Sequence, residues 1–342
     1  MWVKALWSRE YEQSRLFFWA VPVVHFLALG FQRMNRWLFT ELAVVNVRLQ
    51  QIGHARIPFQ EAYGNGEYET TGRLWLLLAM FVLALVQLGT ERKNGSQELL
   101  FALPYSRRQI YMHKWLLGAA LLTATVVLNT AIDMILVLNS PISGYFSLTY
   151  HLAELGYTWL TLLAIYSLVL FVGTITGTVA FQMVLSLVLF ILPAGLIMIL
   201  RSSLEVQGFD VVRPYDGDIG LSAWHDRLID WLSLTTYLTA DYDRLTWLKA
   251  LVMLLLLAAA LTCGMLAYER NRAENNGKLM VFSGWELGLR IGFVVCISMI
   301  AGLFVSELVG FSKRIGYDIG LVAGFVLSTL AIRRLTRMRF HL

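Results

Sequence analysis

Charged residues are scarce in this sequence. Asp, Glu, Lys and Arg together make up 15% of its 342 residues, whereas hydrophobic residues make up 57%. Soluble domains carry about 25% charged residues, so this composition argues against a soluble or an intrinsically disordered protein. Cysteine is scarce as well, because only Cys263 and Cys296 are present and both lie in apolar stretches. Two such residues cannot build the disulfide framework of a secreted scaffold.

Several catalytic motifs are also missing. ATP hydrolysis needs the phosphate-binding loop G-x-x-x-x-G-K-[ST], but Gly277-Lys278 is followed by Leu279 and no other candidate exists. The six histidines form no H-E-x-x-H metal motif, and no G-x-S-x-G is present. We therefore expect that the chain is not an enzyme and that it binds no metal or cofactor of its own.

Long apolar runs fill the space between the few charges. A membrane helix needs about 20 mostly apolar residues, and continuous apolar runs argue against a β-barrel, whose strands alternate. We expect an all-α, polytopic membrane helix bundle of about eight transmembrane helices. Six runs lie between charges at 15–33, 73–91, 114–133, 249–269, 290–307 and 314–333, and the run 154–201 is long enough for two helices with a turn near 178–182.

The distribution of basic residues predicts that both termini are cytoplasmic. The cytoplasmic segments would then hold 16 basic and 7 acidic residues, whereas the rest of the chain holds 12 basic and 16 acidic residues. The net charge of +5 therefore follows from topology and requires no nucleic-acid partner. We expect a multi-pass protein of the cell membrane, in contact with lipids.

The same topology divides the chain into four parts. The four parts are an interfacial amphipathic helix at 1–15, the six-span core at 16–268, a second cytosolic loop at 269–290, and two additional spans with a basic tail at 291–342. The six-span core contains outer segments at 34–72 and 202–243 and a cytosolic loop at 91–114.

The cytosolic loop 91–114 reads ERKNGSQELLFALPYSRRQIYMHK. Asn94 and Gln97 have the spacing of a capping box, as do Ser106 and Gln109. Pro104 disfavours helix in the residue before it. The loop is therefore predicted to contain a short helix, a stop, and a second helix that continues into the third span.

The short helix would carry Leu99, Leu100 and Leu103 at the membrane edge. Two explanations are open from the residues alone. The leucines could pack on the inner ends of the bundle, or they could dock a cytosolic partner that pushes on two spans at once.

This loop resembles the first cytosolic loop of ABC exporter permeases of the type-2 class, which export drugs, polysaccharides or lipids. The matching residues are Glu91, Gly95, Glu98, Leu99, Leu100, Leu103, Pro104, Ser106, Arg107 and Lys114. The resemblance implies a separate cytosolic ATPase that binds ATP and Mg²⁺. It also implies a second permease subunit, either a copy or a sister chain. Glu98, Arg107 and Arg108 would make charged contacts with the ATPase.

The two extra spans depart from the six-span family core. The stretch 268–282 before them is similar to a second inner loop of some Gram-positive members, with Tyr268, Glu274 and Gly277 in matching places. From the residues themselves, Arg270 and Glu274 are spaced to pair on a helix, and Gly277 could close that helix. An ordinary solvated helix end is the alternative.

Few polar residues lie within the spans. His25, Asn129 and Asp133 are the candidates for a substrate path, although hydrogen-bonded packing or an interfacial position explains them as well. Glycines spaced by four residues, at 173 and 177 and again at 316, 320 and 324, suit close helix packing within the chain or between subunits.

Together these features predict the permease subunit of an ATP-driven ABC exporter of a bacterial membrane. The rival functions are an ATPase-partnered sensor or scaffold that moves no cargo, and an intramembrane enzyme.

Overall fold

The computed structural model describes residues 4–55, 66–209, 228–239, 246–271, 277–309 and 312–337. Within these ranges the regular secondary structure is helical, apart from one isolated bridge between Thr176 and Met280. The longer helices are α1 (Lys4–Ala28), α3 (Leu42–Ala55), α5 (Gly66–Lys93), α7 (Arg107–Leu138), α8 (Leu148–Ile175), α9 (Val179–Val206), α12 (Trp247–Arg270), α13 (Ser283–Leu308) and α14 (Lys313–Arg337). Three short helices are α2 (Gly30–Trp37), α6 (Ser96–Ala102) and α11 (Leu234–Leu238).

Among the described residues, 8 helical segments are long and apolar enough to cross a membrane. They are α1 with α2, α5, α7, α8, α9, α12, α13 and α14, so the all-α bundle with eight spans is confirmed. Residues 4–15 continue into the first span as part of α1. Their placement in the membrane interface and the orientation of the termini stay predictions.

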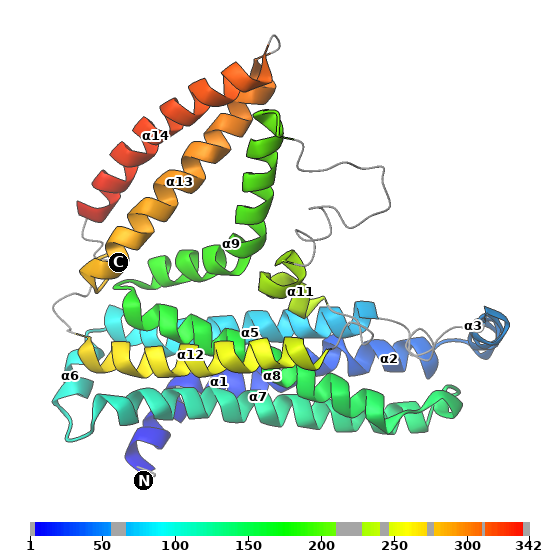
Figure 1. Ribbon diagram of the computed structural model, residues 1–342. Helices are drawn as coiled ribbons and strands as arrows, with labels where there is room; N and C mark the ends of the chain where they lie inside the picture. Colours follow the sequence, from blue (N-terminus) through cyan, green and yellow to red (C-terminus); the bar gives the residue numbers. More distant parts are fainter. Residues whose placement is uncertain are drawn as a thin grey trace. The chain divides into compact units, whose positions relative to one another are not determined.

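The chain divides into two compact units. The first comprises Met1–Gly173 and Tyr237–Arg270, and the second comprises Thr174–Thr236 and Asn271–Leu342. In the first unit, α1 packs against α5 and α7, and α7 packs against α12 (Figure 1). Helix α8 is the most enclosed span, with 78% of its apolar window buried. A helix that is apolar on all sides, as α8 is over residues 160–173, suits such a central position.

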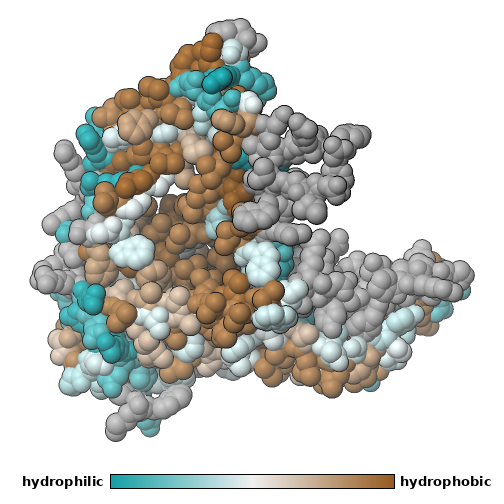
Figure 2. Space-filling model, viewed as in Figure 1, coloured by the Kyte–Doolittle hydropathy of each residue, from teal (hydrophilic) through white to brown (hydrophobic). Residues whose placement is uncertain are grey.

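Many large hydrophobic side chains face outward. Examples are Leu16, which is 76% exposed, and Phe304, which is 67% exposed. Figure 2 shows hydrophobic residues over most of the visible helical surface, with hydrophilic residues gathered in separate patches. Such a surface would be unfavourable in water and suits contact with lipid tails.

The turn between the fourth and fifth spans lies at Thr176–Thr178, slightly before the predicted position. Helix α9 begins at Val179 because the Thr178 side chain caps it and accepts a hydrogen bond from the Phe181 amide. Helix α9 then bends sharply part-way along its length (Figure 1). Pro193 lies at its midpoint, and the missing N–H of proline accounts for the bend.

In the second unit, α13 and α14 form a closely packed antiparallel pair. The glycine ridge of α14 faces α13: a Cβ atom at Gly320 would lie 2.5 Å from the Ala301 carbonyl oxygen, and one at Gly324 would lie 2.6 Å from the Ala301 Cβ. Gly316 approaches the backbone of Ser306 in the same way. Of the two explanations left open for this ridge, the structure shows the packing within the chain.

We expect Gly320→Ala to lower the free energy of unfolding of the full chain, because overpacking costs about 1–3 kcal/mol. The matched control is Gly292→Ala in α13, where a Cβ atom would meet nothing within 4 Å. Both changes gain the same helix propensity, about 1 kcal/mol. Unfolding in mixed detergent micelles measures the difference, and equal stability of the two variants would show that the ridge is not closely packed.

Candidate functional site

The short predicted helix exists as α6, which connects α5 to α7 through one turn on each side. Its first turn begins after Gly95, whose φ of 67° lies in the left-handed region that glycine adopts without strain. The predicted capping box of Asn94 with Gln97 is therefore wrong, because Gly95 occupies the N-cap position and no side chain caps the helix. Gln97 is instead buried.

Helix α6 presents two different faces. Leu100 is 2% exposed and packs inward, whereas Leu99 is 73% exposed and Leu103, just after the helix, is 43% exposed. Glu98 is exposed in the first turn, where a carboxylate interacts favourably with the helix dipole. Leu100 therefore fits the explanation of packing within the bundle, whereas docking of a partner through Leu99 and Leu103 stays a prediction.

The stop and restart after α6 are confirmed. Leu103 is extended and precedes the exposed Pro104. Ser106 then forms the predicted capping box: its hydroxyl accepts from the Gln109 amide at 3.3 Å, and the Gln109 side chain accepts from the Ser106 amide at 3.1 Å. Helix α7 runs from there through Lys114 to Leu138.

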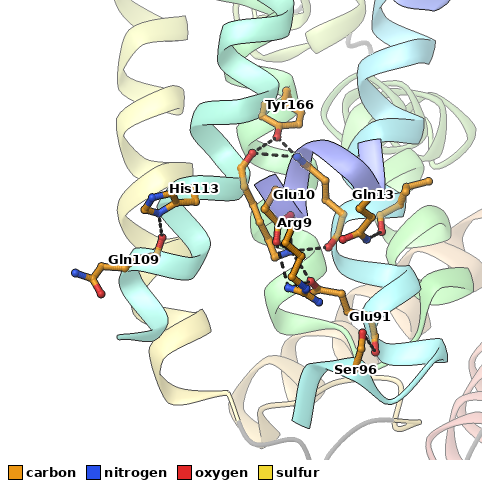
Figure 3. Close-up of polar contacts among 11 residues, drawn as sticks. Arg9, Glu10, Gln13, Glu91, Ser96, Gln109, His113 and Tyr166 are labelled. Atoms are coloured by element: carbon orange, nitrogen blue, oxygen red, sulfur yellow. Dashed lines mark hydrogen bonds and ion pairs between the residues drawn. The ribbon is translucent and has the colours of Figure 1, made fainter. Parts of the chain in front are cut away.

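A buried group of charges joins the two ends of the loop to α1. We name Arg9, Glu10, Glu91 and Lys114 the Lys114 cluster. The Lys114 Nζ donates to both carboxylate oxygens of Glu10 at 2.8 and 2.9 Å and to Glu91 at 2.7 Å. Arg9 pairs with Glu91 at 3.0 Å. Figure 3 shows Arg9, Glu10 and Glu91 converging from α1 and α5.

Charge balance makes this burial tolerable. Lys114 has 0% side-chain exposure, Glu10 has 1% and Glu91 has 3%. Ions removed from water to this degree are stable only when they are paired and hydrogen-bonded. Two basic and two acidic groups compensate each other here, and Lys114 also donates to the Gln87 carbonyl oxygen at 3.1 Å.

Tyr166 of α8 joins α5 to α7 next to the Lys114 cluster (Figure 3). Its hydroxyl bonds the Gln87 side chain at 2.6 Å and the Lys114 carbonyl oxygen at 3.1 Å. A Cβ atom at Gly118 would lie 2.1 Å from that hydroxyl, so glycine is required for α7 and α8 to approach this closely.

The loop is also tied to the end of α12. Arg108 pairs with the Glu269 carboxylate at 2.7 Å, and Arg107 donates to the Glu269 carbonyl oxygen at 3.0 Å. The Arg107 guanidinium lies 4.4 Å from the centre of the Phe101 ring, and Phe101 meets the buried Tyr268 edge to face. Both arginines predicted to contact a partner therefore have contacts within the chain.

The three residues of the second cytosolic loop have different outcomes. Tyr268 is fully buried and contacts the rings of Phe101 and Tyr111. Glu274 lies outside the described residues. Gly277 has a φ of 87°, but α12 ends at Arg270. The interpretation of Gly277 as the cap of that helix is therefore wrong, and its amide instead donates to the Gly177 carbonyl oxygen.

The candidate path residues His25, Asn129 and Asp133 are all buried. Asn129 donates to the carbonyl oxygens of Thr125 and Pro22, at 2.9 and 3.4 Å. Asp133 pairs with Arg33. His25 and Asp133 line the same cavity, whereas Asn129 is not among the cavity residues.

Comparison with known proteins bears on the family of this chain. Residues 61–212, which include α6, match the family model described as ABC-2 family transporter protein. This match, together with the curated relatives, supports an ABC permease. The resemblance found at residues 91–114 is thereby confirmed at the level of the family.

Two curated relatives of this permease come from Bacillus subtilis (strain 168). The probable ABC transporter permease YtrD is 26% identical over 261 residues, covering 73% of this chain and 75% of the relative. The probable ABC transporter permease YtrC is 25% identical over 220 residues, covering 61% of this chain and 63% of the relative. No solved structure gives a significant match.

Sequence reasoning missed the partners of the charges in this permease. Arg15, Arg73, Glu91, Lys114 and Asp133 served as boundaries of apolar runs, and four of the five prove to be paired across helices. A signal was present, because charges that end neighbouring spans at one membrane face lie at similar depth. The sequence alone does not show which spans are neighbours, and this information was missing.

Replacing Lys114 tests whether the cluster holds the loop. We expect Lys114→Met to lower the free energy of unfolding by about 3–5 kcal/mol, because it leaves buried carboxylates without their cation. Adding Glu10→Gln and Glu91→Gln should restore part of the loss, measured by unfolding in mixed micelles.

The control for this change is Lys313→Met. Lys313 pairs with Glu307 at 2.8 Å, but the two side chains are 64% and 68% exposed. An exposed pair contributes about 0–1 kcal/mol. An effect of Lys114→Met no larger than that of the control would contradict a structural role of the cluster.

Proposed function

We propose that the chain is the transmembrane subunit of an ATP-driven exporter and that α6 docks on a separate cytosolic ATPase. One observation carries the proposal: Leu99 is 73% exposed on a short helix inserted directly between two spans. In water this side chain would lose the roughly 1.5–3 kcal/mol that burial of a leucine provides. A partner that covers it recovers this energy.

The neighbouring contacts explain how movement of a docked partner would reach the membrane helices. Glu91 lies in the last turn of α5, Lys114 lies in the second turn of α7, and Glu10 joins both to α1. Glu269 joins the start of α7 to the end of α12. A push on α6 would therefore act on four helices together rather than on a free loop.

The proposal places ATP and Mg²⁺ on the partner, since this sequence has no phosphate-binding loop. It also includes a second permease subunit, either a copy of this chain or a sister chain. Membership among ABC permeases supports an ATPase partner in general.

Purification of the tagged chain from its native membrane tests the docking. We expect a P-loop ATPase to be recovered in near-stoichiometric amount, and Leu99→Asp or Glu98→Lys to reduce its recovery tenfold or more. A loss of about 1.5–3 kcal/mol corresponds to about 10- to 150-fold in affinity.

The matched control is Leu42→Asp at the start of α3, where the leucine is 76% exposed in the predicted outer segment. Retention of the ATPase by Leu99→Asp, or equal loss in Leu42→Asp, would contradict docking at α6. Flux of a cargo in vesicles that contain both subunits separates an exporter from a sensor, which would bind the ATPase without transport.

A further inference from the structure

A cavity lies within the first unit among the helices α1, α5, α7 and α8. Its volume is about 50 Å³, and a water molecule needs about 10–15 Å³ on this measure. The cavity can therefore hold a group of a few heavy atoms. Its polar lining includes His25, Arg73, Asp133 and Glu154, and its apolar lining includes Leu29, Val126 and Leu155.

This cavity is far from the Lys114 cluster. Lys114 and Asp133 lie on the same helix, and 19 residues at 1.5 Å each place them ~28 Å apart. The hydrocarbon core of a bilayer is about 30 Å thick. If α6 is cytoplasmic, the cavity is at the outer end of the bundle, where an exported molecule would leave.

The charges at the cavity are balanced in pairs. Arg73 pairs with Glu154 and also donates to Thr158 at 3.1 Å and to the Leu238 carbonyl oxygen at 3.1 Å. Asp133 pairs with Arg33 and lies 3.6 Å from the His151 ring. Two guanidinium groups thus face two carboxylates. A ligand with a net charge would leave one charge uncompensated in a buried place, which is costly.

His25 supplies an observation independent of these pairs. The residue is 4% exposed and lines the cavity, and its buried Nδ1 has no hydrogen-bond partner among the described residues. A buried polar atom without a partner loses free energy that a ligand can restore. The imidazole nitrogen can donate to or accept from an amide or a hydroxyl group.

We propose that this cavity binds a small, uncharged polar group, the size of an amide, carried by the cargo. Charge balance disfavours groups with a net charge, and a volume of about 50 Å³ suits a group of a few heavy atoms. The apolar residues of the lining suit a hydrocarbon body attached to that group. The assignment to cargo rests on the proposed transport function, whereas the binding site itself does not.

Three probes of the same shape test the charge preference: acetamide, acetate and acetamidinium. The full chain carries Cys263→Ala, Cys296→Ala and Thr130→Cys, because Thr130 lines the cavity. The rate of its modification by the uncharged reagent hydroxyethyl methanethiosulfonate is the readout. We expect acetamide to slow the reaction at least threefold, and acetate and acetamidinium to have no effect at the same concentration.

Variants that remove one charge of the Arg73–Glu154 pair should change the preference from the uncharged probe to a charged probe. In Glu154→Gln, Arg73 loses its carboxylate and acetate should become the protecting probe. In Arg73→Gln, the carboxylate of Glu154 remains and acetamidinium should protect.

Ser143→Cys is the control that no probe should protect, because Ser143 is exposed in the turn between α7 and α8 and lies outside the cavity. Leu155→Cys replaces Thr130→Cys if the latter fails to fold.

Several results would overturn the proposal. These are absence of labelling at both cavity positions, equal protection by all three probes, preference for a charged probe in the parent chain, or protection of Ser143→Cys. None of these measurements involves an ATPase. Loss of ATPase copurification would therefore count against the proposed function alone, and failure of acetamide protection would count against the cavity alone.

Discussion

The pairing of Lys114 with Glu10 and Glu91 is the interaction on which the inner end of the first unit depends. One ammonium group, with 0% side-chain exposure, holds carboxylates from α1 and α5 while its own carbonyl oxygen accepts from Tyr166 of α8. Four helices therefore meet at one residue. A buried ion pair of this kind contributes little net stability but is costly to break, so it constrains geometry more than it adds free energy. The ion pair between Glu91 and Lys114 joins the end of α5 to the start of α7, so it fixes the position of the short helix α6 between them.

A second group of buried charges holds the other end of the same helices. Arg73 with Glu154 and Arg33 with Asp133 join α5 to α8 and α2 to α7. Between the two groups α7 contributes buried apolar residues such as Leu121, Leu122 and Val126. Directional contacts at both ends and adaptable contacts in the middle would let the helices tilt together without losing their register.

Local patterns in the sequence were sufficient for the elements of the fold. The eight spans, the stop at Pro104 and the capping box of Ser106 each depend on neighbouring residues. Where two local rules competed, the prediction failed: Asn94 has the spacing of a cap, but Gly95 alone accommodates the left-handed backbone that begins α6. The buried charge pairs depend on which spans are neighbours, so no single segment contains that information. The cavity at His25 combines residues from four segments and was visible only as isolated polar positions.

Under the proposed docking, the construction of α6 has a consequence for how partners are chosen. Its inward residues, Gln97 and Leu100, are buried. Gly95 begins α6 and Ser106 caps the start of α7 after it, so both connections of α6 are fixed. Only outward positions such as Glu98 and Leu99 can change without disturbing the scaffold. Two related permeases in one cell could therefore recognise different ATPases through a few surface substitutions, and crossed pairing could be avoided without any change in the membrane-spanning helices.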